Sequence, residues 1–233
     1  MIHSKYIRER VLKQPEQKII NAQQLYQKEF EGFSELAFYK QLSRLEKEGQ
    51  LVRLTRGVYC RPKKSRYGPI AASEKQIIDY FLGTKLRNGV IVGYRMYNNY
   101  GLTTQVSKKT NLYSNIVDYD VMNIQNVVAS KASLSFDEDT KKLIELLDVL
   151  ENYQAIEDLN RKNMISLIKN SVKAYSNTKL EKILKVIKFR KSTLASLKNT
   201  LDFFEIENNV GVYLNKTSKY KTFNMEVLHE TAS

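Results

Sequence analysis

The N-terminal part of the chain switches between helical and strand spacing of its apolar residues. Ile2–Leu12 repeats them every three or four positions and runs into Pro15, which discourages continuation of a helix. The short segment Lys18–Ile20 has an extended pattern, and Asn21 is a good N-cap for a brief second helix. We therefore expect the order helix, strand, helix in this part.

A third helix follows, with the clearest periodicity of the N-terminal part. Ser34 is a favourable N-cap, and Gly49 can end the helix in a left-handed conformation. Phe38, Leu42 and Leu45 recur at positions i, i+4 and i+7, so they should face the core. The opposite face is then turned outward and carries Tyr39, Lys40, Ser43, Arg44 and Lys47.

Two alternating segments come directly after this helix. Leu51–Thr55 and Val58–Arg61 flank Arg56-Gly57, where Gly57 can supply the positive φ of a tight hairpin turn. The order helix, strand, helix, helix, hairpin is typical of a winged helix-turn-helix. In that motif the last helix fits the major groove of DNA, and the hairpin contacts the flanking backbone or minor groove.

This pattern predicts a set of DNA-contacting residues on the third helix and the hairpin. Arg44 can make a bidentate contact to guanine, whereas Lys40 and Arg56 are better suited to hold phosphates. A solvated helix face is the alternative for any one of them, and some winged helices bind protein instead. The full predicted set is Ser34, Tyr39, Lys40, Ser43, Arg44, Lys47, Arg53, Thr55, Arg56 and Arg61.

The segment Lys63–Pro69 is the best domain boundary on composition. It is polar and basic, and it ends in Gly-Pro, a pair that breaks helices and strands. We expect a DNA-binding domain over residues 1–66 and a second domain over residues 67–233. Short alternating segments near 90–92, 111–113 and 121–128 predict a small sheet, and amphipathic helices follow to about Phe204 and should form a bundle. The fold class is therefore α+β and mainly helical.

One of the C-terminal helices carries a row of lysines. Lys182, Lys185 and Lys188 recur every three residues opposite the apolar positions, and Arg190 and Lys191 extend the row. We call these five residues the basic ridge. The pattern fits an ordinary solvated face, and it equally fits a surface for RNA, DNA or a protein partner.

Charge is concentrated at the two ends of the chain. Of the net charge of +13, residues 1–66 contribute +8 from 15 basic and 7 acidic residues. Residues 67–160 contribute −3 from 9 and 12, and residues 161–233 contribute +8 from 14 and 6. Such basic ends attract polyanions, so charge alone leaves DNA, RNA and acidic membrane surfaces open as partners.

Several classes of function are disfavoured by what the sequence lacks. Cys60, His3 and His229 are too few to build a usual zinc site, so we expect no structural metal. No apolar run is long enough to span a bilayer, and the N-terminus lacks a signal peptide, so we expect a cytoplasmic protein. No nucleophile–base pair, carboxylate pair or phosphate-binding glycine loop stands out. We expect neither catalysis nor a cofactor.

Several short motifs occur along the chain. They are Leu42-Ser43-Arg44-Leu45 through Gly49, Leu51-Val52-Arg53-Leu54, Arg56-Gly57-Val58-Tyr59, Tyr67-Gly68-Pro69, Gly101-Leu102-Thr103-Thr104-Gln105-Val106 and Leu146-Leu147-Asp148. Together they resemble a known family, the AbiEi antitoxins of bacterial abortive-infection, or type IV, toxin–antitoxin systems, which act in phage defence. The resemblance covers about residues 4–205 and leaves Val210–Ser233 unmatched.

The resemblance implies two activities in one chain. The N-terminal winged helix would repress its own operon by binding double-stranded promoter DNA with repeats. The C-terminal domain would counter a nucleotidyltransferase-like toxin, with or without a stable complex, and the basic ridge is a candidate antitoxin surface. Two other functions stay open: a stand-alone regulator whose C-terminal domain senses a ligand or dimerises, and an RNA-binding protein that uses the basic ridge.

Overall fold

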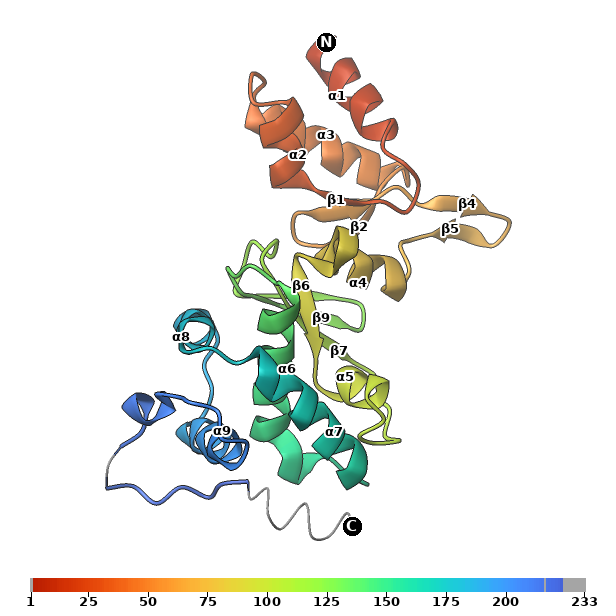
Figure 1. The fold of residues 1–233 in the computed structure, drawn as a ribbon. Coiled ribbons are helices and arrows are strands. Elements are labelled where there is room, and N and C mark those ends of the chain that lie inside the picture. The colour runs from red at the N-terminus through yellow and green to blue at the C-terminus, as the bar shows by residue number, and fades with distance from the viewer. Residues whose placement is uncertain (1, 216, 224–233) are drawn as a thin grey trace. The chain divides into compact units, whose positions relative to one another are not determined.

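The structure is a computed structural model that describes residues 2–215 and 217–223 (Figure 1). It divides into two compact units, each of which we describe by itself. The first contains Met1–Tyr80 and Met122–Val127, and the second contains Phe81–Val121 and Val128–Ser233. The expected α+β class is confirmed. The division into functional domains at residues 66 and 67 stays a prediction, and the first compact unit continues to Tyr80.

The first unit has the predicted order of elements. Asn21 caps the second helix by accepting a hydrogen bond from the Gln24 backbone N–H. Ser34 caps the third helix in the same way through the Ala37 N–H. The elements are α1 (Ile2–Leu12), β1 (Ile19–Asn21), α2 (Ala22–Glu29), α3 (Glu35–Lys47), β2 (Val52–Thr55), β3 (Val58–Cys60), β4 (Lys63–Ser65), β5 (Gly68–Ile70) and α4 (Glu74–Leu82).

Strands β1, β3 and β2 form a three-stranded antiparallel sheet with β3 in the centre. Cys60 pairs with Ile19 on one side and with Val52 on the other. The β2–β3 turn places Gly57 at φ 74°, a conformation that favours glycine, as the sequence predicts. Gly49, after α3, has φ 68°, so the predicted left-handed end of this helix is also confirmed.

The core of the first unit lies between its helices. Phe38, Leu42 and Leu45 of α3 are fully buried, as their spacing predicts, and pack with Ile7 and Val11 of α1. Burial of such side chains stabilises the fold by about 1.5–3 kcal/mol each. This packing fixes which face of α3 is left for solvent.

The expectation that Lys63–Pro69 breaks secondary structure was wrong. Strands β4 and β5 pair in an antiparallel hairpin, in which Lys64 lies opposite Pro69 and Ser65 lies opposite Gly68. A two-stranded hairpin consists of edge strands only, and proline is tolerated there because a ladder hydrogen bond can be missed. The hairpin extends away from the three-stranded sheet of the first unit (Figure 1).

The second unit combines a small sheet with helices. Its sheet contains β6, β7 and β9 in that order, and β6 pairs antiparallel with β7. Among the described residues, no helix has the length and apolar character that crossing a membrane requires. Strand β8 (Val121–Ile124) belongs to the first unit apart from Val121. The other elements after α4 are η1 (Thr84–Leu86), β6 (Gly89–Val92), α5 (Tyr94–Asn99), β7 (Thr110–Ser114), β9 (Val127–Lys131), α6 (Glu138–Asn152), η2 (Tyr153–Ala155), α7 (Arg161–Ser171), η3 (Val172–Ala174), α8 (Asn177–Val186), α9 (Lys191–Phe203) and η4 (Val210–Tyr213).

Helix α6 is the central element of the second unit. It contacts β6, α7, α8 and α9, and its side chains at Leu143, Leu146 and Leu147 are fully buried. Asp137 caps its N-terminus through the Thr140 N–H. Near the other end, Asp148 accepts a hydrogen bond from the Gly93 N–H at the start of α5, so one carboxylate joins two helices.

Candidate nucleic-acid interface

The exposed face of α3 is the first part of the candidate interface. Lys40, Ser43 and Lys47 are exposed and fall on one narrow side of the helix, at relative positions i, i+3 and i+7. Arg44 is exposed beside this row. The helix has 13 residues, which makes it about 20 Å long and a suitable size for the major groove.

Two other predicted residues of α3 have additional roles in the fold. The Ser34 hydroxyl is exposed and serves as the helix cap, at 3.4 Å from the Ala37 N. Tyr39 is half-buried, and its ring packs edge-on against Phe38 with the centroids 5.4 Å apart. Both residues stay at the border of the exposed face, where Tyr39 adds a partly apolar surface.

Polar contacts from α1 hold α3 in place. The Ser4 hydroxyl donates to Oε1 of the buried Gln41 at 2.8 Å. Arg8 forms an ion pair of 2.5 Å with Glu48, just beyond the C-terminal end of α3. Since Glu48 is paired in this way, its negative charge is partly neutralised near the exposed basic face.

The β2–β3 hairpin is the second part of the candidate interface. Arg53 and Arg56 are exposed and Thr55 is half-buried. Arg53 lies opposite Tyr59 in the sheet. Burial raises the pKa of Tyr59, the positive charge of Arg53 opposes this rise, and Glu46 adds to it. Tyr59 is therefore within electrostatic range of both Arg53 on the hairpin and Glu46 on α3.

Arg61 differs from the other predicted contacts because its guanidinium is used inside the first unit. Nη1 donates to the backbone oxygens of Leu12 and Gln14, at 2.6 and 2.7 Å. The group also lies 4.0 Å from the carboxylate of Glu16. Arg61 thus anchors the end of α1, a role that sequence spacing did not indicate.

The helix face and the hairpin both lie in a segment that matches a known family. Residues 16–62 match the family of transcriptional regulators described as AbiEi antitoxin. The resemblance expected from the sequence is thereby confirmed for this segment, which includes α2, α3 and the β2–β3 hairpin. The match also supports a role as an antitoxin or a transcriptional regulator.

Two further comparisons add little to the AbiEi match. No curated protein matches the chain. Among solved structures, the crystal structure of RV2827C protein from Mycobacterium tuberculosis is similar at 11% sequence identity, with 85% of this chain and 75% of that chain covered and a TM-score of 0.38. A likeness at this level carries no argument about function.

Sequence reasoning missed two exposed features of the first unit. Leu36 lies one turn before Lys40 on the same face of α3 and is 80% exposed, so an apolar group stands beside the basic row. Tyr67, at the turn of the β4–β5 hairpin, is 85% exposed, and the Arg66 guanidinium lies 4.6 Å from its ring centroid. The periodicity of α3 already places Leu36 outside the core, and that signal could have found it.

Only part of the basic ridge lies on a single helix. Helix α8 ends at Val186, and Ile187 is extended, so Lys182 and Lys185 lie on α8 whereas Lys188 does not. This corrects the expectation of a continuous helical row. All five side chains of the basic ridge are exposed.

Three members of the basic ridge make contacts within the second unit. Lys185 pairs with Glu181 at 2.8 Å, and Arg190 binds the carboxylate of Glu151. Lys191 donates to Asn215 at 2.6 Å. Arg190 also stands directly before α9 as its N-cap residue. The cationic groups of these three residues are therefore engaged with neighbouring side chains.

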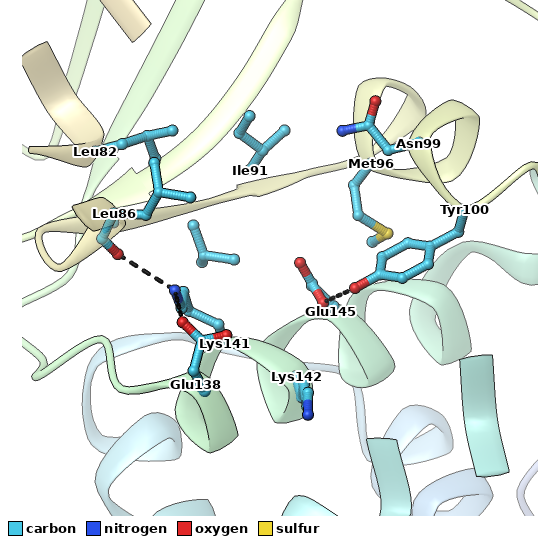
Figure 2. A pocket seen from close by; sticks show the side chains of 12 residues that line it. Leu82, Leu86, Ile91, Met96, Asn99, Tyr100, Glu138, Lys141, Lys142 and Glu145 are labelled. Atoms are coloured by element: carbon cyan, nitrogen blue, oxygen red, sulfur yellow. Dashed lines mark hydrogen bonds and ion pairs between the residues drawn. The ribbon is translucent and has the colours of Figure 1, made fainter. Parts of the chain in front are cut away.

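The second unit also contains a pocket of ≈ 260 Å³ between β6, α5 and α6 (Figure 2). Tyr100 donates a hydrogen bond of 2.7 Å to Glu145 on its wall. Burial raises the pKa of Glu145, although Tyr100 and Lys141 oppose this rise. Lys141 is 9% exposed and pairs with Glu138 at 2.5 Å. The pocket is thus apolar on the β6 side and carries both charge signs on α6.

Proposed function

We propose that this protein is the antitoxin and transcriptional autorepressor of a type IV toxin–antitoxin operon. The observation that carries the proposal is the exposed basic face of α3 beside the β2–β3 hairpin, in the segment that matches the AbiEi family. In this proposal the first unit is a winged helix-turn-helix. Helix α3 enters the major groove, and the β2–β3 hairpin is the wing on the flanking backbone.

The residues divide into two roles on the DNA. Arg44 reads a base, because its planar guanidinium can bond to O6 and N7 of guanine together. Lys40, Lys47, Arg53 and Arg56 hold phosphates and fix the register, which adds affinity without sequence preference. We leave Arg61 out of this set, because its guanidinium is engaged with α1.

The antitoxin activity belongs, in this proposal, to the second unit and opposes a nucleotidyltransferase-like toxin. All five members of the basic ridge are exposed, but Lys185, Arg190 and Lys191 make the contacts described above. Lys182 and Lys188 are therefore best placed to meet an acidic toxin surface or the toxin's phosphate-rich target. Neither activity requires a catalytic step or a cofactor.

Two measurements on the full-length protein test the proposal. A reporter driven by the promoter of its own operon should be repressed by the protein and released by Lys40→Ala with Arg44→Ala. Co-expression with the toxin encoded beside it should restore growth, and the same double variant should still do so. Repression that persists in the double variant would exclude the α3 interface, and failure of growth rescue by the native protein would exclude the antitoxin role.

A stand-alone regulator is the second candidate function, and the pocket in Figure 2 is the observation that favours it. Its mixed lining suits a small ligand with an apolar body and a polar group. A nucleotidyltransferase gene adjacent to this one favours the antitoxin. A missing toxin gene, together with promoter binding that changes with a small metabolite, favours the regulator.

A further inference from the structure

The β4–β5 hairpin, Lys63–Ile70, is an exposed arm whose base is fixed to the first unit. The Gln17 side-chain amide donates to the Ala71 carbonyl at 3.1 Å, and the Gln125 amide donates to the Ala72 carbonyl at 3.0 Å. At the turn, Ser65 donates to the Gly68 carbonyl and accepts from the Tyr67 N–H. The arm is therefore held at its base and closed at its tip.

Positive charge is present on both faces of strand β4 and at the tip of this arm. Lys63 and Lys64 are consecutive in a strand, so their side chains leave on opposite faces, and both are exposed. Arg66 is exposed at the tip, where its guanidinium lies against the Tyr67 ring. Such a contact restricts the rotamers of an arginine and keeps its positive charge.

The surrounding sequence contains no compensating negative charge. Residues 49–73 include six basic residues and no Asp or Glu, and they cover both the β2–β3 hairpin and the β4–β5 hairpin. Five of the six remain when Arg61, which is engaged with α1 and lies near Glu16, is set aside. A surface that serves only solubility mixes both signs. Lysines on an edge strand do prevent edge-to-edge pairing, but that role does not explain a tyrosine that is 85% exposed at the tip.

We propose that the β4–β5 hairpin is a second DNA-contacting arm, which holds phosphates outside the site that α3 reads. The inference rests on the proposed DNA binding by the first unit. The occupant is double-stranded DNA because the arm belongs to the same compact unit as α3, and its three cations suit a polyanion. A two-stranded ribbon fits the major groove, and cations on both of its faces can reach the phosphates of both strands.

The test compares two full-length variants of equal net charge. The arm variant carries Lys63→Gln, Lys64→Gln and Arg66→Gln. The control carries Lys162→Gln, Lys169→Gln and Lys173→Gln, three exposed changes in the second unit. Each protein is titrated with two duplexes from its own promoter. One ends at the edge of the sequence-specific site, and the other extends it by one helical turn, about 10 base pairs, on each side.

We expect the arm variant to bind the extended duplex about tenfold or more weakly than the native protein at physiological salt, and the slope of log K against log salt to fall by about 2–3. Its binding to the short duplex and the control's binding to both should be unchanged. Hydroxyl-radical footprints should lose protection only in the flanks. Native-like binding and footprints in the arm variant would overturn the proposal that the arm contacts DNA, and would leave the proposed function intact. No binding of either duplex by the native protein would overturn both.

Discussion

The Tyr97 hydroxyl donates a hydrogen bond of 2.7 Å to Oδ2 of Asp148, the same oxygen that accepts from the Gly93 N–H at 2.9 Å. Tyr97 is 2% exposed, and its ring lies in the main core of the second unit. One carboxylate of α6 therefore fixes both the start and the middle of α5. The Leu146–Asp148 motif of the sequence is joined to α5 by this contact.

We expect Tyr97→Phe to lower the free energy of unfolding by about 1–3 kcal/mol, because a buried carboxylate loses a donor while the ring volume is kept. Urea denaturation of the full-length protein measures this change. Tyr119→Phe is the matched control, since Tyr119 is 49% exposed in the same unit and its change should stay within about 0.5 kcal/mol. Equal stabilities of the two variants would contradict a structural role for the Tyr97–Asp148 bond.

The same carboxylate gives a prediction about pH. Burial raises the pKa of Asp148, although Tyr97 and Gly93 oppose the rise by donating hydrogen bonds. Asp148 therefore binds its proton more strongly in the folded state than in the unfolded state. Its contribution to the free energy of unfolding is fully present below the unfolded pKa, and it is lost as pH rises through the folded pKa.

This pH effect is measured against Asp148→Asn, which cannot ionise. The unfolding free energy of the native protein minus that of the variant should decrease as pH rises from about 4 towards neutrality. Chemical denaturation at a series of pH values gives both curves, and Glu145 is present in both proteins. A difference that stays constant or grows with pH would contradict the raised pKa.

Arg44→Ala should weaken operator binding by about 1–3 kcal/mol and relax the preference at one base step, because a bidentate base contact is lost. Fluorescence anisotropy with the operator and with single-base substitutions checks both effects. Lys169→Ala, an exposed change in the second unit, is the control for removal of one positive charge. A uniform loss across all duplexes would reassign Arg44 to the phosphates.

Arg56→Ala should act on all sequences alike, because the residue lies at the turn of the β2–β3 hairpin and is expected to hold a phosphate. The slope of log K against log salt should become less steep by about 0.9, the value for one contact on duplex DNA. Titrations of specific and scrambled duplexes at several salt concentrations measure the slope. An unchanged slope with reduced specificity would place Arg56 at a base instead.

The basic ridge can be tested by charge reversal. If Lys182 and Lys188 meet the toxin or its target, Lys182→Glu with Lys188→Glu should abolish growth rescue and leave promoter repression unchanged. Lys162→Glu with Lys169→Glu is the control with the same change of charge in the same unit. Circular dichroism should confirm that both variants fold, since exposed substitutions alter stability by about 0.5 kcal/mol or less. Full rescue by the ridge variant would mark the ridge as a solvated face.

Local signals in the sequence determined the elements of the candidate interface. The caps at Asn21 and Ser34, the helix end at Gly49 and the turn at Gly57 depend on backbone geometry within a few residues, so the sequence predicts them directly. The buried face of α3 follows from a period of 3.6 residues, and the exposed residues follow from it in turn.

Only the tertiary structure decided how particular charges are used. Arg61 and Arg190 look like free surface cations in the sequence, but each binds acceptors far along the chain, at Leu12 and Glu151. The β4–β5 hairpin depends on pairing between strands, which can override a local Gly-Pro signal. Helix α8 ends before Lys188 because Ile187 is buried in an extended conformation. Packing between distant segments determines contacts of this kind, so they cannot be predicted from the local periodicity of the sequence.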